Sequence, residues 1–293
     1  MLLLVPFLQC LAISLIFVGS VQACRKVVTK VTGNEDLTRD DPSQILGRAA
    51  GTLLASAASW VPLWFTLSEH ERLEQLLSLL GLTKPRKGLL FSVFLGAGLS
   101  SLLLLGAYID KMENLAKKLA SKNKRSGLSL EFVRDVLIAP LTEEFCFRSC
   151  MCALLKANGL SSRAVIAVPS CLFGLSHTLR LVDVLARSNS SARWEDASTR
   201  RRRLTDALSL VGGTVCMTTA FGVVASILFV FTGHFACPLS AHMTCNFIGP
   251  PDLEKLTGFR DTKGNFRYAF LTYAGLVSFS VAMVVMARNL PPQ

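Results

Sequence analysis

Charged side chains interrupt an apolar, helix-length stretch near the middle of this chain. The run from Val136 to Leu155 contains two adjacent carboxylates, Glu143 and Glu144, and one guanidinium, Arg148. An ionised side chain at the centre of a bilayer costs about 2.5 to 3.5 kcal/mol on insertion scales, so ionisable groups in such a run are functional candidates by default. The motif Glu-Glu-x-x-x-Arg is therefore the first candidate site.

Two other apolar runs contain polar pairs. Phe173 precedes His177 by four residues, and His242 precedes Asn246 by the same interval. A spacing of four places both members of a pair on one face of a helix. We therefore expect each pair to face a shared region from its own helix.

These residue types are the parts of a peptidase that lacks a covalent nucleophile. A carboxylate and a neutral imidazole that share one water can deprotonate it as it attacks a carbonyl. A second imidazole and a carboxamide can donate hydrogen bonds to the resulting oxyanion. Adjacent helical residues point about 100° apart, so Glu143 and Glu144 are expected to act differently. We assign Glu143 to the water and Glu144 to an ion pair with Arg148.

Simpler readings of the same residues remain open. Glu144 and Arg148 can form an ion pair that only locks helices together, and an intramembrane histidine such as His177 or His242 commonly makes an interhelical hydrogen bond. Two histidines and a glutamate can also hold zinc. Zinc sites of the His-Glu-x-x-His type need two histidines one turn apart, a pair that this sequence lacks, so we expect neither metal nor cofactor.

Prolines precede the three polar motifs. Pro140, Pro169 and Pro238 have no N–H and are each expected to leave the carbonyl four residues earlier without its helical donor. Those carbonyls belong to Val136, Val165 and His234. In a membrane, such freed backbone is tolerated where protein or a wet cavity satisfies it.

Composition indicates a membrane protein. Apolar residues make up 51% of the 293 residues and charged residues 17%, and the mean hydropathy is +0.45. The net charge of +11 does not indicate nucleic-acid binding, because Lys and Arg lie in short connections between apolar runs, where they set topology. The nine cysteines have no metal-binding spacing, and we expect no disulfide framework.

Eight runs approach the roughly 20 residues that a helix needs to cross a bilayer. They lie at Leu2–Ala23, Ala49–Leu67, Gly88–Ile109, Leu130–Leu155, Ser162–Val182, Leu208–Phe231, Gly233–Ile248 and Arg267–Ala287. The predicted fold is all-α: a polytopic membrane protein with about eight helices around an intramembrane polar cavity. We treat residues 1–293 as one domain, with N-terminal helices (1–129), a catalytic core (130–250) and a C-terminal loop and last helix (251–293).

The distribution of basic residues predicts the orientation. With a retained first span and the N-terminus outside, 22 Lys and Arg face the cytosol and 7 face the opposite side. The sequon at Asn189 would then be cytosolic and unmodified. The Arg200–Arg203 run, in the loop 180–207, is expected to be a solvated loop or a contact to anionic headgroups. The polar motifs should converge between mid-membrane and the cytosolic face.

Together the motifs resemble a known family. Glu143-Glu144-x-x-x-Arg148, Phe173-x-x-x-His177 and His242-x-x-x-Asn246, in this order, resemble the type II CAAX prenyl endopeptidases. The resemblance covers residues 130–250 well. It implies an endoplasmic reticulum protease with its active site open to the cytosolic side, which removes the last three residues of prenylated CAAX proteins such as small GTPases.

The resemblance also implies individual roles. Glu143 and His177 would activate water, and His242 and Asn246 would form the oxyanion site.

Two alternative functions are a zinc-dependent intramembrane protease and a transporter or scaffold with a buried proton relay. A chelator that abolishes activity would favour the first, and altered flux without a peptide product would favour the second.

Overall fold

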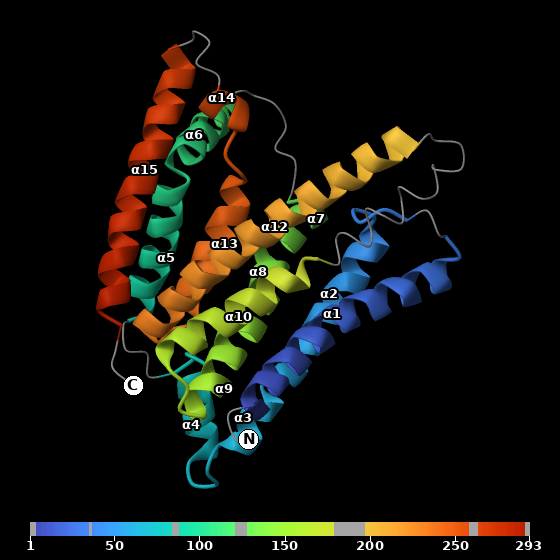
Figure 1. Ribbon diagram of the computed structural model, residues 1–293, viewed down its shortest axis with the longest axis vertical. Coiled ribbons are helices and arrows are strands. Elements are labelled where there is room, and N and C mark those ends of the chain that lie inside the picture. Colours follow the sequence, from blue (N-terminus) through green and yellow to red (C-terminus); the bar gives the residue numbers. More distant parts are fainter. Residues whose placement is uncertain are drawn as a thin grey trace.

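The computed structural model describes residues 4–34, 37–83, 88–120, 128–178, 197–257 and 263–290, and all regular structure within them is helical (Figure 1). The α-helices are α1 Leu4–Thr32, α2 Pro42–Ser59, α3 Val61–Thr66, α4 Arg72–Leu79, α5 Leu89–Leu103, α6 Leu105–Ala120, α7 Leu130–Phe132, α8 Ala139–Glu144, α9 Met151–Ala157, α10 Ser162–Ser176, α12 Ala197–Thr232, α13 Ala236–Ile248, α14 Leu253–Thr257 and α15 Lys263–Arg288. Two π-helical segments, η1 Val133–Ile138 and η2 Phe145–Cys150, complete the list.

Successive long helices run alternately toward the two ends of the molecule (Figure 1). Among the ends of helices next to the connections predicted as cytosolic, those of α6, α14 and α15 lie at the upper end, and those of α1, α2 and α10 point toward it. Helices α4 and α9, the start of α1 and the end of α15 lie toward the lower end. This arrangement separates the two sets of connections that the charge count distinguishes.

Each predicted span corresponds to a helix or a run of helices, but eight crossings are not established. In the described part of the chain, three helices are long and apolar enough to span: Leu4–Thr32, Arg201–Thr232 and Phe266–Arg288. A fourth is α5 with α6, if this pair, bent by 99°, is one span. Helix α13, with 13 residues, is shorter than the length a full crossing needs.

The arginine run differs from its prediction as a loop. Arg201, Arg202 and Arg203 lie in the first turns of α12, which begins at Ala197 and so extends the predicted sixth span at its N-terminal end. Straight-chain arginines are good helix formers, so an apolar helix can continue through them into a polar region. The sequon at Asn189 lies outside the described residues.

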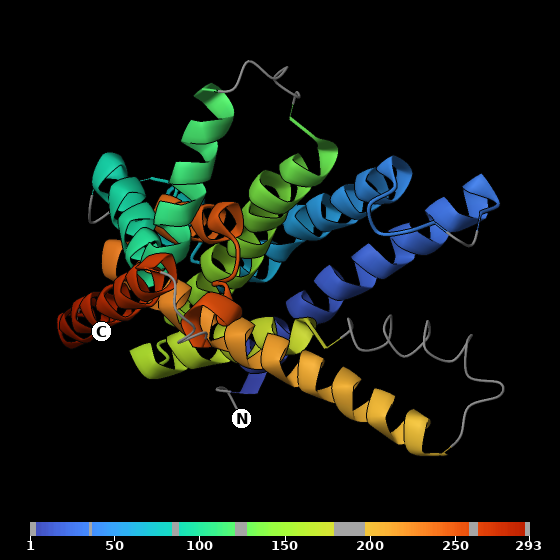
Figure 2. The ribbon, with the colours of Figure 1, turned by 90° about the horizontal axis from the view of Figure 1, so that it is seen from above.

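The run Leu130–Ala157 forms the centre of the molecule. Seen from above, it lies between the α1–α2 pair and the group of α5, α13 and α15 (Figure 2). Its second half contributes fully buried side chains to the main hydrophobic cluster, among them Phe147, Leu154 and Leu155. All nine cysteines are free thiols, and five of them are buried.

Glycine allows the helices that carry the site to approach closely. A Cβ on Gly96 of α5 would collide with the Cys237 carbonyl of α13, and one on Gly174 of α10 would collide with Thr219 of α12. Small residues at such crossings allow the close backbone packing on which helix association in lipid depends. Helices α13 and α12 are thereby held against α5 and α10.

Candidate active site

The two glutamates lie between two π-helical segments. Helix α8, which ends at Glu144, is preceded by η1 and followed by η2. At the end of η1 the N–H of Ala139 donates to the carbonyl of Arg134, five residues earlier, and at the end of η2 that of Met151 reaches Cys146 in the same way. Single π turns inside α-helices occur frequently at functional sites.

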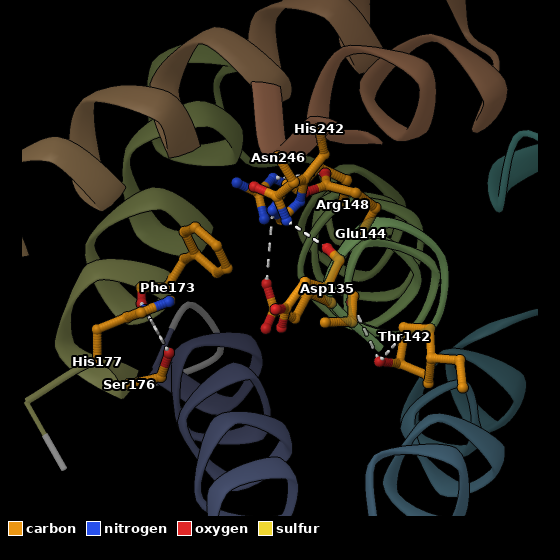
Figure 3. A network of polar contacts seen from close by, with 12 residues as sticks. Asp135, Thr142, Glu144, Arg148, Phe173, Ser176, His177, His242 and Asn246 are labelled. Atoms are coloured by element: carbon orange, nitrogen blue, oxygen red, sulfur yellow. Dashed lines mark hydrogen bonds and ion pairs between the residues drawn. The ribbon is translucent and has the colours of Figure 1, made fainter. Parts of the chain in front are cut away.

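Glu144 connects the central helix to α13. Its side chain is 0% exposed, and Oε1 lies 2.7 Å from Nδ1 of His242. Its other oxygen, Oε2, lies 3.2 Å from Nε of Arg148. The predicted ion pair is therefore present, and the same carboxylate also accepts a hydrogen bond from His242, which the spacing did not indicate (Figure 3).

Arg148 is also 0% exposed and is surrounded by aromatic rings. Its guanidinium carbon lies 4.3 Å from the ring centroid of Phe173 and 5.8 Å from that of Phe221. Neither Nη atom has a hydrogen-bond partner among the described residues. Cation–π attraction and the Glu144 carboxylate thus replace the water that this cation would otherwise bind.

Glu143 occupies a more open position than its neighbour. Its side chain is 20% exposed, and Oε2 lies 3.8 Å from Nε2 of His242. Both carboxylates therefore approach the same imidazole, Glu144 at Nδ1 and Glu143 at Nε2. Because its carboxylate is partly exposed, Glu143 can also meet a ligand.

His177 ends α10 and has its own orientation. Its Nδ1 lies 2.8 Å from the carbonyl oxygen of Phe173 and 3.3 Å from Oγ of Ser176. A carbonyl only accepts hydrogen bonds, so Nδ1 carries the proton and the neutral ring has an unprotonated Nε2. The half-buried ring is directed toward the group formed by Glu144, Arg148 and His242 (Figure 3).

The predicted pairing of His177 with Glu143 is not a direct contact. Within the described residues, the side chain of His177 makes hydrogen bonds to Phe173 and Ser176 and not to Glu143, and the Phe173 ring separates it from Arg148. The ring centroids of Phe173 and His177 are 4.8 Å apart. Phe173 therefore packs between the Glu144–Arg148 ion pair and His177.

Asn246 lies one helical turn beyond His242 and is exposed. Its Nδ2 donates a hydrogen bond of 2.7 Å to the main-chain carbonyl of Asp135. A second amide proton on Nδ2 remains for another acceptor. Helix α13 thus presents an imidazole and a carboxamide along one face, as the spacing predicts.

The freed carbonyl beside Pro140 is shifted by one residue from its predicted position. The π turn pairs Ala139 with Arg134, so the carbonyl that would face the missing N–H of Pro140 is that of Asp135 and not that of Val136. The prediction for Pro238 was wrong for another reason. That proline lies in the first turn of α13, and the His234 carbonyl accepts from Cys237 N–H at 3.2 Å.

Sequence reasoning missed two residues of this site. Asp135 lies at the edge of its apolar run, where an acidic residue is usually an ordinary surface charge. Pro140, five residues later, is the feature of the sequence that could have identified it. Phe221 contacts both Arg148 and His242, with 4.8 Å between the Phe221 and His242 ring centroids. A phenylalanine in an apolar span carries no distinguishing pattern.

No group of three His, Cys, Asp or Glu side chains with metal-site geometry occurs in the described ranges. The imidazole of His242 is occupied at Nδ1 by Glu144, and His177 has Nδ1 on a carbonyl. What the arrangement offers is acid–base chemistry: one accessible carboxylate, two imidazoles of fixed orientation and one carboxamide.

Comparison with known proteins gives consistent results. Residues 125–248, which include all six predicted site residues, match the family described as Type II CAAX prenyl endopeptidase Rce1-like. The chain is 34% identical to CAAX prenyl protease 2 of Arabidopsis thaliana over 165 residues, which are 56% of this chain and 47% of that relative. It is 28% identical to CAAX prenyl protease 2 of Homo sapiens over 258 residues, 84% of this chain and 71% of the human protein.

The chain thus spans about half the length of the Arabidopsis relative that it matches. No solved structure matches it. The family match covers the helices that bring Glu143, His177, His242 and Asn246 to one region. Residues 125–248 thus resemble the type II CAAX prenyl endopeptidase family, and the chain is similar to the CAAX prenyl proteases 2 of Arabidopsis thaliana and Homo sapiens.

Proposed function

We infer that this chain is an intramembrane endopeptidase that removes the C-terminal tripeptide from farnesylated or geranylgeranylated CAAX proteins. The observation that carries this inference is the accessible carboxylate of Glu143 beside an imidazole that a second, buried carboxylate orients. Its relatives in Arabidopsis and human are named CAAX prenyl proteases, which supports the same substrate class.

The proposed reaction begins with a water held between Glu143 and Nε2 of His177. Glu143 takes a proton as the water oxygen attacks the scissile carbonyl carbon, and the carbonyl π electrons move to its oxygen. Collapse of the tetrahedral intermediate breaks the C–N bond. The same proton passes to the leaving amine, which departs as the free tripeptide. The unprotonated Nε2 that follows from the Phe173 contact suits His177 to accept a hydrogen bond from this water.

The oxyanion is assigned to α13. The free Nδ2 proton of Asn246 donates to it, and Nε2 of His242 is the second donor. Because Nδ1 of His242 already donates to Glu144, Nε2 can donate only when the ring is protonated. Glu144 thus supports the oxyanion site through His242.

The proposed location is the endoplasmic reticulum membrane, with the site open to the cytosol. Asn246 and His177 lie near the ends of α13 and α10 that point toward the upper end in Figure 1, the end assigned to the cytosol by the basic residues. A prenyl tail would enter sideways from lipid, and the peptide carboxyl end would reach the polar group from water.

Purified protein incubated with a farnesylated CAAX peptide tests this function. Mass spectrometry should show release of the intact terminal tripeptide, and His177→Ala should abolish that release. His70→Ala is the matched control, because His70 is an exposed histidine next to α4 at the opposite end of the molecule. A farnesylated peptide that stays intact with well-folded wild-type protein would overturn the proposal.

A further inference from the structure

One main-chain carbonyl in the central helix has lost both of its helical donors. In an α-helix the Asp135 carbonyl accepts from residue 139, and in a π-helix it accepts from residue 140. The N–H of Ala139 is directed to Arg134, and Pro140 has no N–H. The backbone around Pro140 therefore offers one unfilled acceptor to the neighbouring helices.

Asn246 fills this acceptor. Its Nδ2 lies 2.7 Å from the Asp135 oxygen, a contact between residues 111 positions apart. Since a carbonyl cannot donate, the contact also decides which end of the carboxamide faces the central helix. The nitrogen faces the central helix, and its second proton remains for another acceptor.

The side chain of Asp135 holds this residue from the opposite direction. Arg134 donates to both of its oxygens, from Nε at 2.7 Å and from Nη2 at 2.9 Å. Arg39, from the segment before α2, donates to Oδ1 at 3.2 Å, and Arg134 continues to Asp40 at 2.8 Å. Asp135 is thus fixed by a charged group on one side, which leaves its carbonyl at a defined place for Asn246.

We propose that Pro140 is a positioning residue for Asn246: by removing one N–H within a π turn, it keeps the Asp135 carbonyl free to orient the carboxamide. This rests on the proposed role of Asn246 as an oxyanion donor. An alanine at position 140 would supply an N–H to the π register or let the helix return to α pairing. Either change gives the Asp135 carbonyl a backbone donor and releases Asn246.

The chain contains a matched control for this proposal. Pro169 inside α10 also frees a carbonyl, that of Val165, and the thiol of Cys152 donates to it at 3.5 Å. Both residues of this second contact lie within the hydrophobic core. A Pro169→Ala variant therefore makes the same chemical change in a neighbouring helix without touching the carboxamide.

The test measures kcat and KM for tripeptide release from a farnesylated CAAX peptide in four variants: Pro140→Ala, Asn246→Ala, the double variant and Pro169→Ala. Misplacement of a reacting group by about 1 Å costs on the order of 100-fold, so Pro140→Ala should lower kcat by about 10- to 100-fold with KM unchanged. In the Asn246→Ala background the same substitution should have no further effect. Pro169→Ala should keep the wild-type kcat.

Two kinetic results would overturn the proposal: full kcat in folded Pro140→Ala, or an equal loss of kcat on Pro140→Ala in the presence and absence of Asn246.

A second measurement needs no folded proline variant. In wild-type protein labelled with ¹⁵N-asparagine, the Asn246 side-chain amide, assigned by its loss in Asn246→Ala, should show one proton protected from exchange and one exchanging fast. Two protons that exchange equally fast would also overturn it. This result is independent of cleavage, so it separates failure of the positioning from failure of the proposed function.

Discussion

The site has an inner half and an outer half that differ in exposure. In the inner half, Glu144 and Arg148 are fully buried, and Phe173 and His242 pack against them. In the outer half, Glu143 and His177 are partly exposed and Asn246 is exposed. Two adjacent glutamates thus lie in different surroundings. In the proposed mechanism the inner half orients groups and stabilises the fold, while the outer half meets the substrate.

The largest expected effect comes from breaking the inner half. Glu144→Gln leaves Arg148 as an uncompensated buried charge, which typically destabilises a protein by about 3 to 5 kcal/mol. It also removes the carboxylate that orients His242, so activity should fall together with the unfolding temperature in detergent. Retained stability and activity in this variant would contradict the division into halves. Glu69→Gln, at an exposed glutamate, is the matched control.

Glu143→Gln should separate activity from stability. General acid–base catalysis typically contributes 10²- to 10⁴-fold, so the rate of tripeptide release should fall by about that factor. The unfolding temperature should stay near that of the wild type, because the side chain is partly exposed and its oxygen lies as far as 3.8 Å from Nε2 of His242. A parallel loss of stability would place Glu143 with the inner half.

Asn246→Ala should affect activity alone and by a smaller factor. Removing one oxyanion donor typically costs about 10² to 10³ in kcat. The change is expected in kcat with little effect on KM, because the hydrogen bond to substrate forms in the transition state. Steady-state kinetics on a prenylated peptide measure both. A change confined to KM would assign Asn246 to ground-state binding.

Phe221→Leu sharpens the description of the inner half. It removes one of the two rings next to Arg148, and a desolvated cation–π contact is worth up to about 2 kcal/mol. A modest fall in the unfolding temperature is expected, with a smaller effect on rate. The control is Phe266→Leu, since Phe266 on α15 is exposed. An identical response of both variants would show that the contact between Phe221 and Arg148 does not stabilise the protein.

The smallest effect is expected from a chelator. The proposed reaction uses water activated by Glu143 and His177, so removal of divalent cations should leave tripeptide release unchanged. Loss of activity that added zinc restores would instead support the zinc-dependent alternative.

Much of this architecture follows from the sequence, because burying charge in an apolar helix is costly. Because of that cost, Glu143, Glu144 and Arg148 could be identified as candidate site residues. A spacing of four predicted the Glu144–Arg148 pair and the shared face of His242 and Asn246. The apolar runs also predicted helices in these parts of the chain.

What could not be predicted depends on helix register and on contacts between distant segments. The π turn before Pro140 moves the free carbonyl from Val136 to Asp135, and no periodicity rule anticipates a single inserted residue. The hydrogen bond between Glu144 and His242 joins residues 98 positions apart. Its existence depends on how α13 packs against the central helix, which the sequence alone does not specify.

In the proposed mechanism Glu143 performs chemistry and does not hold the substrate. The most direct test of this role compares wild-type and Glu143→Gln protein with one farnesylated CAAX peptide, measuring binding by fluorescence anisotropy and tripeptide release by mass spectrometry. We expect the variant to bind the peptide as tightly as the wild type and to release almost no tripeptide. Release at the wild-type rate by Glu143→Gln would contradict the proposed mechanism.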